Sequence, residues 1–98
     1  MLKAIIIDDE KKARDTLKLA LQMYCNNIEI IGEADGVLPG FSLISQNKPD
    51  IVFLDIKMKD GSGFDLLKKF NVVNFIPIFV TAYNEFAIKA FKFSALDY

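Results

Sequence analysis

The chain has 98 residues, 52% of them hydrophobic and 26% charged, which fits one globular domain rather than two domains or a disordered segment. Its 12 Lys and Arg residues nearly balance 13 Asp and Glu residues and form no basic stripe, which argues against direct nucleic-acid binding. The absence of His and the single cysteine, Cys25, exclude a Cys/His zinc site, His-dependent catalysis and an internal disulfide, and they favour a reducing compartment.

No segment has the pattern of a membrane span or of an export signal. The apolar runs at residues 4–7 and Ile51–Leu54 are far shorter than the ~20 residues that a membrane helix needs. Residues 1–7 are followed at once by Asp8, Asp9 and Glu10, without the long apolar core of a signal peptide. We therefore expect a soluble, cytoplasmic protein that makes no contact with a membrane.

The first third of the chain predicts a strand, a helix and a second strand. Residues 4–7 form a continuous apolar run, as in a strand buried on both faces. Lys11–Tyr24 has helical periodicity, and the positions expected to face the core are Ala13, Leu17, Ala20, Leu21 and Tyr24. The positions of this helix expected in solvent are Lys11, Lys12, Arg14, Asp15 and Lys18. Ile28–Ala34 reads as a strand, and its Glu29 and Glu33 suit the edge of a sheet.

The remainder of the chain repeats this alternation. Pro39 can open a helix that carries Leu38, Phe41 and Ile44 inward. Further elements are predicted as a strand at Ile51–Leu54 ending in Asp55, a helix at 63–70 with Phe64, Leu67 and Phe70 on one side, and a strand at 76–80 ending at Thr81. Asn84 is an expected N-cap of a helix to Phe91, and residues 95–98 are expected to begin a fifth strand. Alternating strands and helices predict one α/β domain over residues 1–98, with a parallel sheet and right-handed crossovers.

Chemically useful side chains follow three of the predicted strands. Asp8, Asp9 and Glu10 follow the first strand, Asp55 follows the third and Thr81 the fourth. In doubly wound sheets, ligands bind outside the carboxyl ends of the strands, so neighbouring first and third strands would bring these carboxylates together. Crowded carboxylates recruit a cation, and an oxygen-only set suits Mg²⁺. Asp55 could then act as a nucleophile towards a phosphoryl donor, with the Thr81 hydroxyl donating to a phosphoryl oxygen.

Each of these residues also has a purely structural interpretation. Acidic residues 8–10 would be favourable at the positive end of a helix dipole, and Asp55 could be a turn former or N-cap. Thr81 is ordinary strand material. We expect the loop residues Lys57, Lys59 and Asp60 to be solvated. The coincidence of three such motifs at successive strand ends favours the functional interpretation.

The motifs together resemble receiver domains of two-component signalling. They are IIIDDE at 5–10, DIVFLDIKM at 50–58 with Gly63, and FVTAY at 79–83. Residues 81–91 and 94–98 resemble the receivers that precede LytTR-type DNA-binding domains. The resemblance covers the whole chain. It implies a flavodoxin-like, doubly wound parallel sheet with strand order 2-1-3-4-(5), whose last strand and last helix are missing or incomplete here.

The resemblance also implies roles for individual residues. Asp55 would be the phosphoacceptor, Asp8, Asp9, Asp55 and the Lys57 carbonyl would bind Mg²⁺, and Thr81, Tyr98 and Ala82 would be the switch hydroxyl, the switch aromatic and the small residue that leaves access to the site. The implied donor is a sensor histidine kinase. The implied output is a DNA-binding domain outside this segment. Such a domain is a regulatory phosphoacceptor that promotes its own phosphorylation and dephosphorylation, not an enzyme with a separate substrate.

Two departures from the family pattern matter. Lys59 stands where a Pro usually follows the loop Met, which should alter loop stiffness more than chemistry. A Lys-Pro pair is expected three residues beyond Tyr98, so the Lys that contacts the phosphoryl group is absent from these 98 residues. If the chain ended there, the edge of strand 76–80 and the stripe of Leu17, Leu21 and Tyr24 would be uncovered. We would then expect marginal stability or pairing with a second copy.

Two alternative functions remain. A degenerate receiver would act as a protein-interaction module without phosphotransfer, and it would not bind a phosphoryl mimic in the presence of Mg²⁺. A phosphatase-like enzyme with an Asp nucleophile would turn over small phosphate esters. That class usually places its nucleophile after the first strand with a second Asp two residues later, whereas Lys57 holds that position here.

Overall fold

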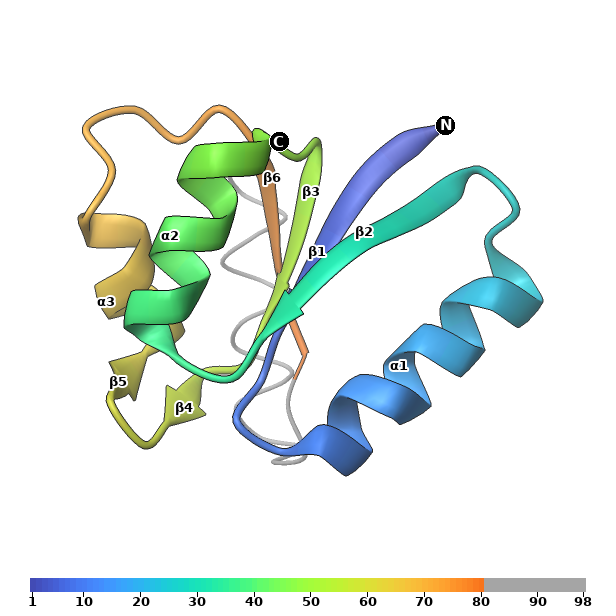
Figure 1. Ribbon diagram of the computed structural model, residues 1–98, viewed down its shortest axis with the longest axis horizontal. Helices are drawn as coiled ribbons and strands as arrows, with labels where there is room; N and C mark the ends of the chain where they lie inside the picture. The colour runs from blue at the N-terminus through green and yellow to red at the C-terminus, as the bar shows by residue number, and fades with distance from the viewer. Residues whose placement is uncertain (81–98) are drawn as a thin grey trace.

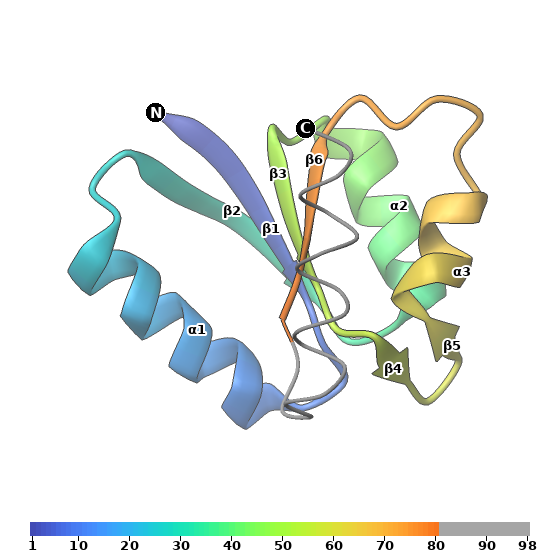
Figure 2. The same ribbon diagram turned by 180° about the vertical axis from the view of Figure 1, so that it is seen from behind.

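The computed structural model describes residues 1–80, which form a parallel sheet with helices on both faces (Figure 1). The strands lie in the order β2-β1-β3-β6 and are β1 (Leu2–Ile7), β2 (Ile28–Ala34), β3 (Ile51–Leu54) and β6 (Ile76–Phe79). α1 (Lys11–Tyr24) covers one face, and α2 (Val37–Asn47) and α3 (Gly63–Lys68) cover the other, as the opposite view in Figure 2 also shows. The predicted doubly wound fold and its order 2-1-3-4 are confirmed, with β6 as the fourth long strand.

The central strands are buried because both of their faces are covered. β1 pairs in parallel with β3, so that Ile7 lies opposite Leu54 at the carboxyl end of both strands. β2 pairs with β1 on the other side, with one register shift between Ala4 and Ile5. All four residues of β3 are buried, which explains its uninterrupted apolar sequence. β2 lies at the edge of the sheet, as its glutamates predicted.

Side chains from the sheet alternate between two hydrophobic clusters. Ile5 and Ile7 point into the cluster with α2 and α3, whereas Ala4 and Ile6 point into the cluster with α1. The larger of the two clusters includes the fully buried Leu66 of α3. The sheet is therefore held from both sides, and its strand ends are fixed relative to one another.

Helical periodicity predicted α1 correctly in extent but not in every side chain. Leu21 is buried and Leu17 half-buried against the sheet, as expected. Tyr24 was expected to face the core, but it is 79% exposed at the last turn of the helix. Leu38 was likewise expected inside and is 63% exposed, because α2 begins at Val37 and turns Val37, Phe41 and Ile44 towards the core instead.

A short hairpin between β3 and α3 was not predicted. β4 (Lys57–Met58) pairs antiparallel with β5 (Gly61–Ser62), and Met58 is buried. α3 then begins with a capping box, in which the Ser62 hydroxyl accepts from the Asp65 N–H and the Asp65 carboxylate accepts from the Ser62 N–H. This helix ends at Lys68, two residues before the predicted end at Phe70. The hairpin fixes the course of the chain immediately after Asp55.

Several predictions fall outside the described residues 1–80. These are Thr81, Ala82, the helix opened by Asn84, and the strand expected to end in Tyr98. Within residues 1–80, none of the helices has the length and apolar character needed to cross a membrane.

Candidate functional site

Three aspartates meet where β1 and β3 end. Because these strands pair in parallel, their carboxyl ends lie side by side, and the Asp55 N–H donates to the Ile7 carbonyl at 2.9 Å. One carboxylate oxygen from each of Asp8, Asp9 and Asp55 lies within 4.8 Å of the others. The predicted convergence is therefore present for Asp8, Asp9 and Asp55, whereas Glu10 is exposed and is not part of this group.

The three carboxylates form an oxygen-only, partly buried set. All three side chains are of intermediate exposure, so they are neither fully hydrated nor sealed from solvent. Hard divalent cations prefer carboxylate oxygens, and Mg²⁺ usually takes one or two of them and keeps several waters. The donor set fits Mg²⁺ on these grounds. Lys57 is exposed at the start of β4, and its carbonyl as a further ligand stays a prediction.

Burial and neighbouring negative charges raise the pKa of two of these carboxylates, Asp8 and Asp55. Partial burial and the neighbouring charge of Asp8 raise the pKa of Asp55 to about 6, against opposing hydrogen bonds from the Lys57 and Ile56 backbone N–H groups. The pKa of Asp8 is also raised, first by burial and then by the charges of Asp9 and Glu10. A cation would relieve this repulsion, so the site favours cation binding.

Gly63 allows the chain to pass close to the phosphoacceptor candidate. A Cβ atom at residue 63 would lie 2.6 Å from the Asp55 carbonyl oxygen and 2.8 Å from the ring of Phe79. The Gly63 N–H donates to the Ile56 carbonyl at 3.0 Å. Only a residue without a side chain fits this contact, which accounts for the Gly in the loop motif.

A cavity of about 460 Å³ lies between α1 and the sheet, next to the ends of β1 and β3. Its lining includes Asp8 and Asp55, together with apolar side chains of α1 and β3 such as Leu17 and Phe53. Two aspartates of the cluster therefore border this cavity.

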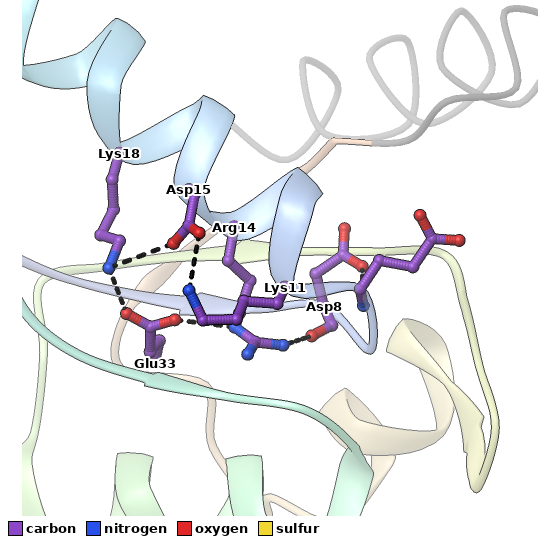
Figure 3. A network of polar contacts seen from close by, with 7 residues as sticks. Asp8, Lys11, Arg14, Asp15, Lys18 and Glu33 are labelled. Atoms are coloured by element: carbon purple, nitrogen blue, oxygen red, sulfur yellow. Dashed lines mark hydrogen bonds and ion pairs between the residues drawn. The ribbon is translucent and has the colours of Figure 1, made fainter.

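Arg14 and Lys18 were predicted to be solvated, but both form ion pairs with Glu33 of β2. Arg14 also contacts the backbone of Asp8 directly. Figure 3 shows Arg14 between Glu33 and Asp8: its Nε donates to Glu33 Oε1 and its Nη1 donates to the Asp8 carbonyl, each at 2.7 Å. The side chain of Arg14 is only 14% exposed. The prediction that Arg14 faces solvent is therefore wrong, because β2 supplies a counter-charge that helical periodicity alone does not reveal. Lys18 remains 32% exposed while it pairs with Glu33.

Asp60 has a structural role that the sequence pattern did not predict. Its carboxylate accepts hydrogen bonds from the backbone N–H groups of Val37 and Leu38, at 2.8 and 3.2 Å. It thus caps α2 from the β4–β5 hairpin, 23 positions away from Val37 in sequence. The available signal was Gly36, which cannot cap a helix with its own side chain and so leaves the place to another residue.

Comparisons with known proteins identify the family. Residues 4–98 match the family model described as response regulator receiver domain. The chain is 48% identical over 101 residues to the sensory transduction protein LytT of Bacillus anthracis, with all of this chain and 40% of that protein aligned. It is 39% identical over 100 residues to the transcriptional regulatory protein BtsR of Escherichia coli K12, covering all of this chain and 41% of that protein. The chain thus spans about 40% of the length of these relatives.

Solved structures show the same fold. The response regulatory domain of mrkE from Klebsiella pneumoniae superposes with a TM-score of 0.76 at 30% identity, covering 93% of this chain and 75% of that one. The response regulator domain of CheB from Thermotoga maritima gives a TM-score of 0.78 at 23% identity, covering 94% and 72%. At that identity the second likeness concerns the fold alone.

Proposed function

Because this chain belongs to the response regulator receiver domain family, we propose that it is the phosphorylation-controlled receiver of a two-component transcriptional regulator, with Asp55 as the phosphoacceptor. The observation that carries this proposal is the convergence of the Asp8, Asp9 and Asp55 carboxylates to within 4.8 Å at adjacent strand ends. A lone aspartate at a strand end would also suit a turn, whereas three in this arrangement suit a cation and a phosphoryl group.

The proposed reaction transfers a phosphoryl group from a histidine of a sensor kinase to Asp55. A carboxylate oxygen of Asp55 attacks phosphorus, the phosphorus–nitrogen bond to the kinase histidine breaks, and its electron pair stays on the imidazole nitrogen. The attack needs an ionised carboxylate, and a pKa of about 6 leaves Asp55 mostly ionised near pH 7. Mg²⁺, when bound, offsets the negative charge that three carboxylates and a phosphoryl group bring together.

The proposal assigns separate roles in cation binding and in phosphorylation to individual residues of this chain. Asp8 and Asp9 would hold the cation with Asp55, and the Lys57 carbonyl would complete the protein's share of ligands. Hydrogen bonding from the backbone N–H groups of Lys57 and Ile56 lowers the pKa of Asp55 and so favours its ionised form, although burial raises that pKa overall. Thr81 as the switch hydroxyl, Tyr98 as the switch aromatic and Ala82 as the small access residue are further parts of the proposal.

The partners and output of the receiver are proposals as well. Receivers of this family interact with histidine kinases, and we propose a sensor histidine kinase as the donor. Relatives 2.5 times as long as this chain are named sensory transduction and transcriptional regulatory proteins, so we propose a transcriptional output through a DNA-binding segment outside these residues, in the cytoplasm. A second copy of the chain is a further proposed partner.

Phosphorylation of single-residue variants tests the proposal. The intact protein is incubated with Mg²⁺ and a labelled small acyl phosphate, or with a phosphorylated histidine kinase. We expect label on the wild type and none on Asp55→Asn. Asp35→Asn is the matched control, since Asp35 is an exposed aspartate outside the cluster, and it should be labelled normally. Label that persists in Asp55→Asn contradicts the assignment. A wild type that takes up no label and binds no beryllium fluoride with Mg²⁺ favours an interaction module without phosphotransfer.

A further inference from the structure

Both peptide units that flank Asp8 are tied to β2. The Asp8 N–H donates directly to the Ala34 carbonyl at 3.1 Å. The carbonyl of Asp8, which belongs to the peptide unit joining it to Asp9, accepts from Arg14 Nη1 at 2.7 Å. Arg14 is in turn held by Glu33 of β2. The backbone that carries the first two aspartates is therefore fixed from two sides.

The contact through Arg14 is rigid for three reasons. The guanidinium is planar, so one donor fixed on Glu33 determines the direction of the donor that reaches the Asp8 carbonyl. Its side chain is 14% exposed, so water competes little for these hydrogen bonds. Glu33 also pairs with Lys18 (Figure 3). Lys18 and Arg14 together lower the pKa of Glu33, which keeps it ionised.

We propose that Arg14 is a positioning residue for the metal site: anchored on Glu33, it fixes the peptide unit between Asp8 and Asp9 so that both carboxylates point towards Asp55. The proposal rests on the proposed function in taking these aspartates as cation ligands. In this proposal Arg14 favours Mg²⁺ binding through geometry, by holding the loop. Its positive charge acts in the opposite direction, because it repels Mg²⁺.

Geometry and charge therefore predict opposite results for the same substitution. Arg14→Gln removes a positive charge next to the carboxylates, and by charge alone Mg²⁺ should bind more tightly. If Arg14 acts by holding the loop, Mg²⁺ should bind more weakly. Substitution of partners that orient metal ligands typically weakens binding by 10- to 100-fold, and we expect roughly 10-fold here because Arg14 holds the backbone rather than a ligand atom.

The experiment is a calorimetric Mg²⁺ titration of the intact chain, four single-residue variants and one double variant. The matched control is Lys12→Gln, which removes a cation from the first turn of α1; Lys12 is exposed and forms no ion pair with any residue in the range 1–80. It should bind Mg²⁺ as tightly as the wild type or slightly more tightly. Arg14→Lys can reach only one of the two acceptors at a time and should restore part of the affinity. Glu33→Ala touches neither aspartate and should nevertheless weaken Mg²⁺ binding.

A double variant separates a shared role from two independent ones. Arg14→Gln combined with Glu33→Ala should bind Mg²⁺ about as weakly as Arg14→Gln alone, because both residues act through the same hydrogen bonds. Metal-free thermal unfolding of each variant shows whether it is folded at the titration temperature. A residue that only stabilised the fold would lower the unfolding temperature and leave the Mg²⁺ affinity of the folded protein unchanged.

The outcomes are distinct. Weaker binding in Arg14→Gln with unchanged binding in Lys12→Gln supports the positioning role. Equal or tighter binding in a folded Arg14→Gln overturns it and leaves the phosphoacceptor proposal intact. A folded wild type that binds no Mg²⁺ overturns the metal part of the proposed function and the positioning role with it.

Discussion

The Asp60 carboxylate caps α2 from another part of the chain: Oδ1 accepts from the Val37 N–H at 2.8 Å. Its second oxygen accepts from the Leu38 N–H at 3.2 Å. These hydrogen bonds join the hairpin that follows Asp55 to the helix that follows β2. They also lower the pKa of Asp60, because they stabilise the charged form.

Removal of this cap should weaken the fold measurably. Asp60→Ala leaves two backbone donors of α2 without their acceptor and should lower the free energy of unfolding by about 1 kcal/mol. Asp60→Asn keeps an oxygen acceptor and should cost less. Urea denaturation at pH 7 measures both. Because the pKa of Asp60 is lowered on folding, the deficit of Asp60→Asn should shrink as the pH falls through the folded pKa of Asp60. Equal stability of wild type and Asp60→Ala would contradict the capping role.

Neutral side chains at Asp8 and Asp9 should uncouple metal binding from stability. The double variant Asp8→Asn, Asp9→Asn relieves repulsion within the cluster, so we expect equal or higher thermal stability in EDTA. Wild type should gain roughly 2.7 kcal/mol when Mg²⁺ is present at about 100 times its dissociation constant, and the double variant should gain almost nothing. Thermal unfolding with and without Mg²⁺ measures both effects. A large loss of stability in EDTA would instead identify these residues as structural caps.

Asp55 should make the metal-free stability depend on pH in an unusual direction. Its pKa is raised from 3.8 to about 6 on folding, so the folded state binds this proton more tightly than the unfolded state. The resulting contribution is complete below about pH 3.8 and is lost as the pH rises through about 6. Other carboxylates titrate in the same range, so the quantity to measure is the difference in unfolding free energy between wild type and Asp55→Asn. We expect wild type to lose stability relative to the variant between these pH values.

The same proton competes with the cation. Mg²⁺ affinity of the wild type should therefore fall as the pH drops through about 6, where Asp55 becomes protonated. Calorimetric titrations at pH 5 to 8 measure this. A constant affinity over that range would show that Asp55 is not a ligand or is ionised throughout.

A methyl group at residue 63 should disturb the site more than one elsewhere in the core. Gly63→Ala places Cβ 2.6 Å from the backbone oxygen of Asp55 and 2.8 Å from Phe79, so the chain must move. We expect a loss of about 1–3 kcal/mol in the free energy of unfolding. Gly32→Ala is the matched control, because the nearest atom to its Cβ is a terminal methyl carbon of the flexible Leu43 side chain, at 3.1 Å. A Gly63→Ala variant as stable as Gly32→Ala would show that the loop has room to relax.

The sequence predicted the elements whose signal is local. The continuous apolar runs gave β3 its observed bounds, and the helical period gave α1 its bounds, because burial of a whole face imposes a pattern on neighbouring residues. The convergence of Asp8 and Asp55 followed from the geometry of parallel strands. These predictions needed no knowledge of which side chains meet across the fold.

The errors lie where a residue finds its partner on another element. Hydropathy places Arg14 in solvent, yet Glu33 and the Asp8 carbonyl give it two acceptors that lie far apart in sequence. Asp60 is an exposed loop residue, as predicted, but its capping of α2 was not foreseen because the Val37 N–H lies 23 positions away in sequence. Tyr24 shares the period of the buried positions of α1, but it sits at the last turn, beyond the part that the sheet covers.

The register shift between β1 and β2 has a consequence for the metal loop. Ala4 lies opposite Ile30 and Ile5 opposite Gly32, so Ile31 is an extra residue in the ladder. With it, Glu33 lies opposite Ile6, whose side chain is in the cluster under α1; without it, Glu33 would lie opposite Ile7, on the side of α2. Whether an acid at this position can reach Arg14 thus depends on the face of the sheet at which β2 presents it, although β2 itself contributes no metal ligand. A natural insertion or deletion of one residue before Glu33 would move that acid to the opposite side of the sheet.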